Sequence, residues 1–396
     1  MMRTRWTITL FLTLALLVIS IAPAAAHPGL PPTAPAGPLN ASPSAWGTGA
    51  PVPTAGWLMG GASIDNCTFY AIGGNTPGSH AVTNMDLYNP LTDAWTSRAP
   101  LPIALYGIQP SAYGARIYVV GGYPDISVPT YAVTSTLIYD SLSNSWSNGA
   151  PIPVGVDGIG TAAQAAYNGK IYVIGGDDGD LNSNNTNYEY TIASDSWTLR
   201  APMPTAREND VAVALNGKIY VAGGAQGSDP DYNGMTTFEA YDPATDAWSA
   251  LAPMQTARVS PGIATDGAYV YVYGGEDSLG AAITSLASAE RYNPATNSWS
   301  YVDTMAQSTG GMTAAYAAGR IYAAGGINSV NGVYTRIDTN QYLTVGANGC
   351  QPTAVNVANF ARPDRRSSMS ALWLLALLAL GGTFAVTRRL AHGRSR

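Results

Sequence analysis

The residue types that most enzymes use for catalysis or metal binding are scarce in this sequence. The chain of 396 residues has three histidines, His27, His80 and His392, and two cysteines. It contains no HExxH, GxSxG or P-loop motif. A Ser/His/Asp set would depend on His80 alone, because the other two histidines lie near the chain ends. We therefore predict no catalytic residues, no bound metal and no cofactor.

One acidic loop has the ligand spacing of an EF-hand. Carboxylate and amide oxygens, which suit Ca²⁺, stand at Asp178, Asp180, Asn182, Asn184 and Glu189. However, serine occupies the position at which the EF-hand turns through glycine, and Glu189 adjoins a tyrosine in a strand-like segment. We therefore favour a plain polar loop and keep calcium as the alternative.

The elements that position these side chains follow from a repeat. Five tyrosines recur every 51 residues, and a tryptophan follows each one seven residues later. The tyrosines are Tyr88, Tyr139, Tyr190, Tyr241 and Tyr292, and the tryptophans are Trp95, Trp146, Trp197, Trp248 and Trp299. Six Gly-Gly pairs, ending at Gly74, Gly122, Gly176, Gly224, Gly275 and Gly326, each close an apolar β-type run. A period of about 50 residues with such segments indicates an all-β propeller of six blades, with four antiparallel strands per blade.

The order Gly-Gly, Tyr, Trp, in segments such as YDPATDAWSALAPMQTAR, resembles the kelch repeat from Pro43 to about Cys350. The resemblance implies a six-bladed kelch β-propeller. It does not imply one activity, since kelch propellers include substrate adaptors, secreted sugar oxidases and sialic-acid mutarotases. The copper-radical oxidases of the family need two histidines around one metal, and the repeats of this sequence contain one.

The first and last repeats predict how the ring closes. The last repeat has Tyr342 but no following tryptophan, whereas Trp46 stands alone before the first complete repeat. We expect the segment around Trp46 to supply the outer strand of blade six. Cys67 would then open the second strand of blade one, and Cys350 would follow the third strand of blade six. This places both at one end of neighbouring blades and predicts a disulfide, with two unpaired buried thiols as the alternative.

The loops after each Gly-Gly pair and the loops between blades are expected to meet at one end of the propeller. The resemblance implies that peptides or sugars bind there. The candidate ligand-binding residues in these loops are Tyr106, Asp177, Asp178, Arg207, Glu208, Asp229, Asp231, Arg258, Glu276 and Asp277. Each arginine can hold buried groups of the fold or bind a carboxylate of a ligand. Only two repeats have this arginine, which favours ligand contact.

The chain ends predict export and anchoring. Residues 1–26 have the basic start, apolar run and small residues of a signal peptide, and the uncharged stretch 369–387 is long enough to span a bilayer. The predicted order is signal peptide 1–26, Pro/Ala-rich linker 27–42, propeller 43–350, stalk 351–368, transmembrane helix 369–387 and basic cytoplasmic tail 388–396. This describes a single-pass type I protein, exported across the cytoplasmic membrane and anchored at the cell surface. The alternative is a bacterial sorting signal that is cleaved, but no LPxTG or PEP motif precedes the helix.

Charge narrows the partners. The predicted propeller has 10 basic and 24 acidic residues, so its net formal charge is about −14, which argues against nucleic acid. A protein, a peptide or a neutral or cationic glycan remains, besides the membrane itself. Two functions are open: a non-catalytic binding module, or a sugar-handling enzyme resembling the secreted kelch mutarotases. In the enzyme, Arg207 or Arg258 and Glu208 would act in acid/base steps.

Overall fold

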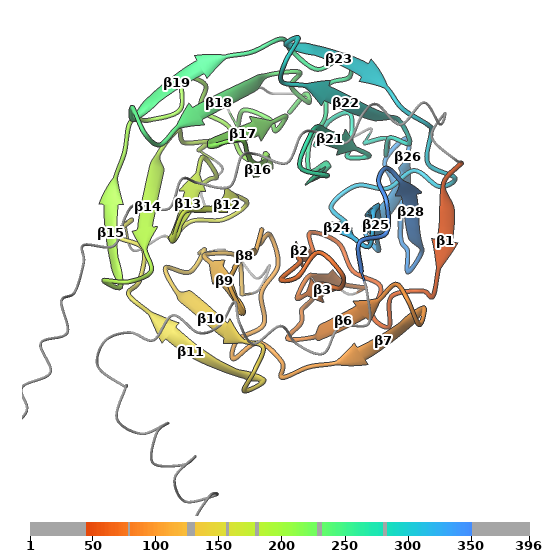
Figure 1. The fold of residues 1–396 in the computed structure, drawn as a ribbon, viewed down its shortest axis with the longest axis horizontal. Helices are drawn as coiled ribbons and strands as arrows, with labels where there is room; N and C mark the ends of the chain where they lie inside the picture. Colours follow the sequence, from red (N-terminus) through yellow and green to blue (C-terminus); the bar gives the residue numbers. More distant parts are fainter. Residues whose placement is uncertain are drawn as a thin grey trace, which may run out of the picture. The chain divides into compact units, whose positions relative to one another are not determined.

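Six four-stranded antiparallel sheets surround a central channel as the blades of a β-propeller (Figure 1). The computed structural model describes residues 45–77, 80–124, 131–155, 158–178, 182–227, 232–279 and 283–350. Within these residues, the predicted fold and the predicted number of blades and strands are confirmed. The predicted signal peptide, linker, stalk, transmembrane helix and tail lie outside them, as do the first two residues, 43 and 44, of the predicted propeller.

The strands of each blade run from the channel outward. Blade one has β2 (Gly60–Ala62), β3 (Phe69–Ile72), β6 (Met85–Asn89) and β7 (Ala94–Ser97). Blade two has β8 (Ser111–Tyr113), β9 (Arg116–Val120), β10 (Thr136–Asp140) and β11 (Ser145–Gly149). Blade three has β12 (Ala163–Tyr167), β13 (Lys170–Ile174), β14 (Asn187–Thr191) and β15 (Ser196–Leu199).

The second half of the ring repeats this order. Blade four has β16 (Val211–Leu215), β17 (Lys218–Ala222), β18 (Phe238–Asp242) and β19 (Ala247–Ala250). Blade five has β20 (Gly262–Thr265), β21 (Val270–Tyr273), β22 (Ala289–Asn293) and β23 (Ser298–Tyr301). Blade six has β24 (Thr313–Ala317), β25 (Arg320–Ala324), β28 (Asn340–Thr344) and β1 (Gly47–Gly49). Two short hairpins follow Gly-Gly pairs: β4 (Asn75–Thr76) with β5 (His80–Ala81), and β26 (Ile327–Val330) with β27 (Val333–Arg336).

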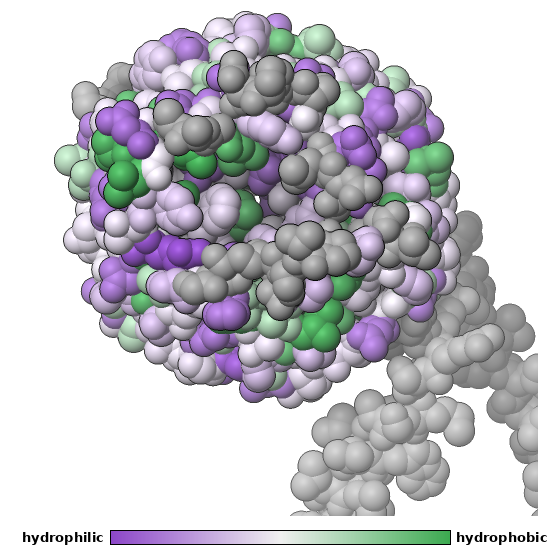
Figure 2. Space-filling view, turned by 180° about the vertical axis from the view of Figure 1, so that it is seen from behind, coloured by the Kyte–Doolittle hydropathy of each residue, from purple (hydrophilic) through white to green (hydrophobic). Residues whose placement is uncertain are grey.

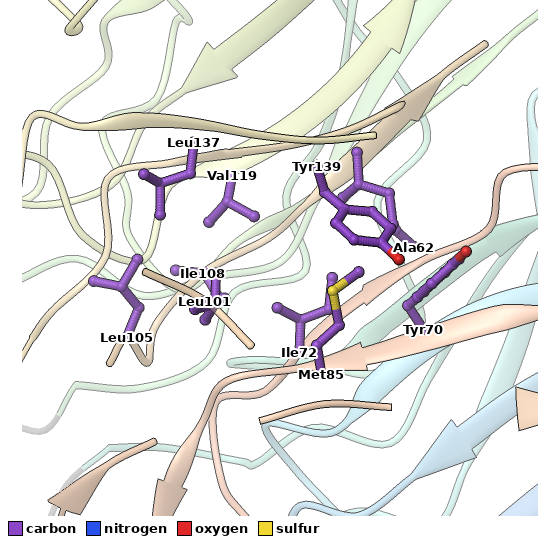
Figure 3. Close-up of a cluster of buried hydrophobic side chains, with 11 residues drawn as sticks. Ala62, Tyr70, Ile72, Met85, Leu101, Leu105, Ile108, Val119, Leu137 and Tyr139 are labelled. Carbon is purple, nitrogen blue, oxygen red and sulfur yellow. The ribbon is translucent and has the colours of Figure 1, made fainter. Parts of the chain in front are cut away.

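Neighbouring blades pack face to face through apolar side chains. Between blades one and two, Tyr70, Ile72 and Met85 meet side chains of the second blade and of its connecting loop (Figure 3). The second strands of the blades are fully or almost fully buried because both of their faces are covered. Their β-branched and aromatic residues suit this position. Burial of such side chains is the main source of stability for the ring.

The periodic Tyr and Trp join the outer edges of neighbouring blades. In blade three, the Tyr190 hydroxyl donates to Asp195 Oδ1 at 2.6 Å, and the same oxygen accepts the Ala150 N–H of blade two at 2.6 Å. The Trp197 indole N–H donates to the Ala150 carbonyl at 2.8 Å. Both backbone groups of one alanine are thus held, and we call this arrangement the clasp. It recurs on Ala50, Ala99, Ala201 and Ala252, with Asp93, Asn144, Asp246 and Asn297 in the place of Asp195.

The ring closes as the sequence predicts. Strand β1 pairs with β28, with Gly47 opposite Tyr342, so the N-terminal segment is the outer strand of blade six. The Trp46 indole N–H donates to the Asp303 carbonyl of blade five at 2.9 Å, as the other tryptophans do in their clasps. Cys67 and Cys350 form the predicted disulfide, with their Cα atoms 5.4 Å apart. The two chain ends of the ring are therefore joined by strand pairing and by a covalent bond between blades one and six.

The part of the chain that the structure describes contains no helix of the length and apolarity that crossing a membrane requires. The predicted membrane-spanning stretch, 369–387, lies outside that part.

Candidate functional site

Two sets of loops meet at one end of the channel, as expected. In every blade, the first residue after the Gly-Gly pair forms an antiparallel bridge with a residue of the loop that leads into the same blade. The six bridges are Trp57–Asn75, Tyr106–Tyr123, Gly160–Asp177, Glu208–Ala225, Val259–Glu276 and Gly310–Ile327. We call these twelve residues the mouth ring. Their backbones are alike in all blades, whereas their side chains differ from blade to blade.

A second ring of residues lies directly inside the mouth ring and holds the blades together. It consists of Leu58, Gly107, Thr161, Asn209, Ser260 and Gly311, all with φ between +46° and +64°. Each of the last five donates its N–H to the carbonyl of the preceding member, and the N–H of Met59 closes the circle on Gly311. A left-handed conformation costs about 1–3 kcal/mol at a non-glycine residue. These hydrogen bonds between blades offset the cost.

All six residues of this inner ring line a cavity of about 110 Å³ in the channel. Seen from the side opposite to Figure 1, the ring of blades is hollowed near its centre (Figure 2). Pockets that enclose small molecules commonly measure about 300–1,000 Å³. The cavity directly behind the mouth ring is therefore too small by itself to enclose a ligand of that kind. A second cavity of about 290 Å³ lies further along the channel and shares six lining residues with the first. It is lined mainly by residues of the innermost strands and not by the mouth ring.

Acidic and aromatic side chains connect blades two, three and four in the mouth ring. The Tyr123 hydroxyl donates to Asp177 Oδ1, and the Thr161 hydroxyl donates to Asp177 Oδ2 at 2.6 Å. Burial raises the pKa of Glu208 to about 9, and the nearby charge and hydrogen bond of Asp177 add to the shift. A raised pKa of this size favours the neutral, protonated form of Glu208 at neutral pH. The Tyr106 ring packs on Tyr123 with their centroids 5.4 Å apart.

A different contact connects blades five, six and one. The Glu276 side chain of blade five lies against Gly310 of blade six, where an added Cβ would come within 2.7 Å of the Glu276 Cδ. The Trp57 indole N–H of blade one donates to Glu276 Oε1 at 3.2 Å. Burial raises the pKa of Glu276 to about 8, although the hydrogen bond from Trp57 acts in the opposite direction. Among the described atoms, Glu276 Oε2 has no hydrogen-bond partner.

Arg207 and Arg258, which were expected to contact a ligand at the loop end, are buried and do not reach the surface of this structure. Both are 0% exposed. Arg207 Nη2 lies 2.9 Å from Glu239 Oε2, and Arg258 Nη2 lies 3.0 Å from Glu290 Oε1. Each arginine therefore pairs with a glutamate on the third strand of its own blade.

The restriction of this arginine to two blades has a structural reason. In blade two, Leu105 takes the place of the arginine and Leu137 the place of the glutamate, and both belong to one apolar cluster (Figure 3). In blades four and five the arginine pairs with a glutamate of the third strand, and in blade two apolar residues replace both together. An uneven distribution among the repeats is thus compatible with a purely structural role.

The remaining predicted site residues are distributed as follows. Tyr106, Asp177, Glu208 and Glu276 belong to the mouth ring. Asp178 is partly exposed and accepts hydrogen bonds from Asn182, while Asp277 is exposed and accepts the N–H of Thr284. Asp229 and Asp231 lie outside the described residues.

Eight of the twelve mouth-ring residues were not predicted, and three of the eight, Asn75, Tyr123 and Trp57, carry polar or large aromatic side chains. Asn75 and Tyr123 directly follow Gly-Gly pairs, as Asp177 and Glu276 do. Their common position directly after the glycines therefore could have identified them. They were missed because the candidate residues after the Gly-Gly pairs were chosen for their charged side chains. Trp57 belongs to no periodic set, and only its bridge to Asn75 assigns it to the site.

The structure does not place Glu189, the last ligand of the EF-hand pattern, where it could bind calcium. Glu189 lies on β14 of blade three, where Lys170 Nζ is 2.6 Å and Arg200 Nη2 is 2.9 Å from its Oε1. These cations occupy the carboxylate that the EF-hand pattern requires. Within the described residues, no three acidic, histidine or cysteine side chains converge as metal ligands would.

Comparison with known proteins agrees with this architecture. Residues 107–326 match the family described as "KLHDC2/KLHL20/DRC7 Kelch-repeats domain". The chain is similar to human Kelch-like protein 23, with 29% identity over 262 residues, which cover 65% of this chain and 43% of that protein. It is also similar to Kelch-like protein terF of Aspergillus terreus, with 26% identity over 254 residues, which cover 60% of this chain and 54% of that protein. The matched regions thus make up about half of these relatives.

A solved structure titled "Structure of YjhT" aligns with a TM-score of 0.61 and 16% sequence identity. The alignment covers 75% of this chain and 97% of that one. At this identity the likeness concerns the fold alone.

Proposed function

Since the chain belongs to the kelch-repeat family, we propose that it is a non-catalytic recognition module that binds a protein or peptide at the mouth ring. A neutral or cationic glycan is the other ligand class that fits the charge. The relatives support this proposal only as members of the same family, because this chain covers half or less of most of them.

The observation that carries the proposal is the contrast between the clasp and the mouth ring. The clasp uses the same residue types in five blades, whereas the mouth ring presents a different pair in each blade on one repeated backbone. Variable side chains on a rigid scaffold are the usual arrangement of a binding surface. The small channel cavity also favours a ligand that lies across the mouth rather than one that is enclosed.

The proposal includes a place for the protein: exported, and anchored in the cytoplasmic membrane by residues 369–387. The sequence of both chain ends supports this placement, and so does the disulfide, since such bonds persist in oxidising compartments. The test is fractionation of cells that make the full chain, followed by protease treatment of intact cells. A protein that sediments with membranes, resists carbonate extraction and is cleaved from outside agrees with the proposal. A full-length chain in the soluble cytoplasmic fraction would contradict it.

The binding function is tested with the full chain in detergent micelles, applied to peptide and glycan arrays. Trp57→Ala removes a partly exposed aromatic side chain of the mouth ring, and Tyr113→Ala removes an exposed one from β8, next to the hairpin turn at Gly114. For the ligands found, we expect Trp57→Ala to weaken binding at least about tenfold, as buried aromatic anchors do, and Tyr113→Ala to leave it unchanged. Equal effects of the two variants would place the ligand elsewhere.

One feature supports the enzyme alternative: burial and the neighbouring Asp177 raise the pKa of Glu208 to about 9, as a general acid requires. Arg207 and Arg258 cannot serve this enzyme as surface groups, because both are buried in ion pairs. In addition, neither of the two channel cavities, of about 110 and 290 Å³, is lined by Arg207, Glu208 or Arg258. Sugar anomerisation followed by NMR, with wild type and Glu208→Gln, tests this alternative. A rate that equals the uncatalysed rate would eliminate it.

A further inference from the structure

The chain has five glutamates, and all five are buried, but their partners differ. Glu189, Glu239 and Glu290 each pair with a lysine or arginine. Glu208 lies beside Asp177, whose hydrogen bond helps to raise the pKa of Glu208. Glu276 has neither kind of partner within the described residues: Oε1 accepts the Trp57 indole N–H, and Oε2 accepts nothing. Glu276 therefore lies in the mouth ring without a counter-charge.

The surroundings of Glu276 are shaped to bring it to Trp57. An added Cβ at Gly310 would lie 2.7 Å from the Glu276 Cδ, and an added Cβ at Gly311 would lie 2.4 Å from the Trp57 Nε1. Any larger residue at these two positions would push the two side chains apart. The carboxyl from blade five and the indole from blade one thus meet over the two glycines of blade six.

Trp57 remains partly exposed in this arrangement. The face of a tryptophan ring attracts ammonium and guanidinium groups, more strongly than other aromatic rings do. The indole N–H donates to Glu276, so when this carboxyl is ionised its negative charge lies next to the ring and adds to the attraction. Burial holds the pKa of Glu276 at about 8, so the free protein carries mainly the neutral carboxyl at pH 7, and a bound cation favours the ionised form. A bound cation would supply the counter-charge that the buried carboxyl lacks.

We propose that Trp57 and Glu276 form a pocket for the basic side chain, lysine or arginine, of a bound peptide. This inference rests on the proposed binding function and specifies its ligand class. The ring of Trp57 contacts the basic group, and Glu276 supplies the charge behind it. The excess of acidic residues in the propeller favours approach of such a peptide.

The test uses the indole N–H signal of Trp57 in NMR spectra of the ¹⁵N-labelled full chain, assigned with Trp57→Phe. The probes are acetyl-arginine amide, acetyl-lysine amide, the neutral isostere acetyl-citrulline amide, and glucose. We expect the two cations to shift the Trp57 signal with saturation, and citrulline and glucose to leave it in place. Equal shifts with citrulline, or a shift with glucose alone, would overturn the proposal.

Two variants separate the pocket from general electrostatics. Glu276→Gln preserves the size of the side chain and an oxygen that accepts the indole N–H, but removes the charge. Asp277→Asn removes the same charge from the neighbouring exposed residue and serves as the matched control. We expect at least a tenfold weaker cation affinity for Glu276→Gln and no change for Asp277→Asn. The indole signals of the clasp tryptophans, such as Trp95 and Trp146, report whether each variant is folded. Equal affinities in a folded Glu276→Gln would refute the proposal.

These results are distinguishable from those on the arrays. If array ligands depend on Trp57 but the cationic probes do not bind, the basic pocket is refuted and the binding function stands. If the probes bind but no array ligand depends on the mouth ring, the pocket stands and the proposed function is refuted.

Discussion

The clasp makes a quantitative prediction at Asn144, which replaces the aspartate of other clasps in blade two. Asn144 Oδ1 accepts the Tyr139 hydroxyl at 2.7 Å and the Ala99 N–H at 2.9 Å, and its φ is +51°. Asn144→Ala removes both hydrogen bonds and places a residue with a Cβ and no local hydrogen bond in the left-handed region. The hydroxyl left without a partner on buried Tyr139 costs about 1–3 kcal/mol. The left-handed conformation of alanine costs about 1–2 kcal/mol.

We therefore expect Asn144→Ala to lower the free energy of unfolding by about 3 kcal/mol, since part of the site is exposed and water compensates there. In calorimetry of the full chain this corresponds to a decrease in Tm of roughly 6–12 °C. The free energy of unfolding of Asn144→Asp should stay within about 0.5 kcal/mol of that of wild type. In three other clasps an aspartate, Asp93, Asp195 or Asp246, accepts the equivalent tyrosine hydroxyl. The pKa of Asp93 lies below its usual range, chiefly because Tyr88 donates a hydrogen bond to it, so an ionised carboxylate suits this place.

Asn144→Gly separates the two contributions. Glycine loses the hydrogen bonds but adopts a positive φ without strain, so it should be about 1 kcal/mol more stable than the alanine variant. The reasoning is refuted if Asn144→Ala unfolds like wild type, or if Asn144→Asp is as destabilised as Asn144→Ala.

Three further predictions concern other parts of the ring. Cys67→Ser should lower the free energy of unfolding by up to about 5 kcal/mol, since the bond closes a separation of 283 residues; reducing agent should destabilise wild type but not the variant. Arg258→Leu should lower the free energy of unfolding by about 3–5 kcal/mol because it leaves Glu290 buried without its cation. Adding Glu290→Leu should restore most of this free energy, since Leu105 and Leu137 occupy the equivalent positions in blade two. A double variant that is no more stable than Arg258→Leu would contradict this. Burial raises the pKa of Glu276 from 4.5 to about 8, so the stability contributed by its protonated form is complete below about pH 4.5 and is lost as the pH rises to about 8. In urea unfolding, the free energy of unfolding of Glu276→Gln should therefore rise relative to that of wild type by at most about 1.4 kcal/mol per pH unit in this window. If the two free energies keep a constant difference across the window, Glu276 does not titrate there.

The repeat predicted the scaffold because its tyrosine and tryptophan make the same contacts in five of the six blades. The tyrosines and tryptophans recur since each must hold one alanine of the preceding blade, and Trp46 could be assigned to blade six because it performs the contact that the last repeat lacks. The disulfide followed from the same strand order, which brings the starts and ends of equivalent strands together.

The site was less predictable because its contacts cross between blades or depend on strand register. The partner of Arg258 is 32 residues away, and only the register of blade five places Glu290 beside it. Trp57 reaches Glu276 across 219 residues and across the whole of blade six. The left-handed residues Leu58 and Thr161 have no sequence signal, because their conformation is imposed by the hydrogen bonds between blades.

The most direct test of the central claim, that the mouth ring is the binding surface, is amide hydrogen exchange of the full chain with and without a ligand found on the arrays. We predict slower exchange on binding in the loop segments around Trp57, Tyr106 and Asp177, and unchanged exchange at the opposite hairpin turns, such as those at Asn168 and Asn216. Protection that is confined to the hairpin turns, with the mouth ring unchanged, would contradict the account.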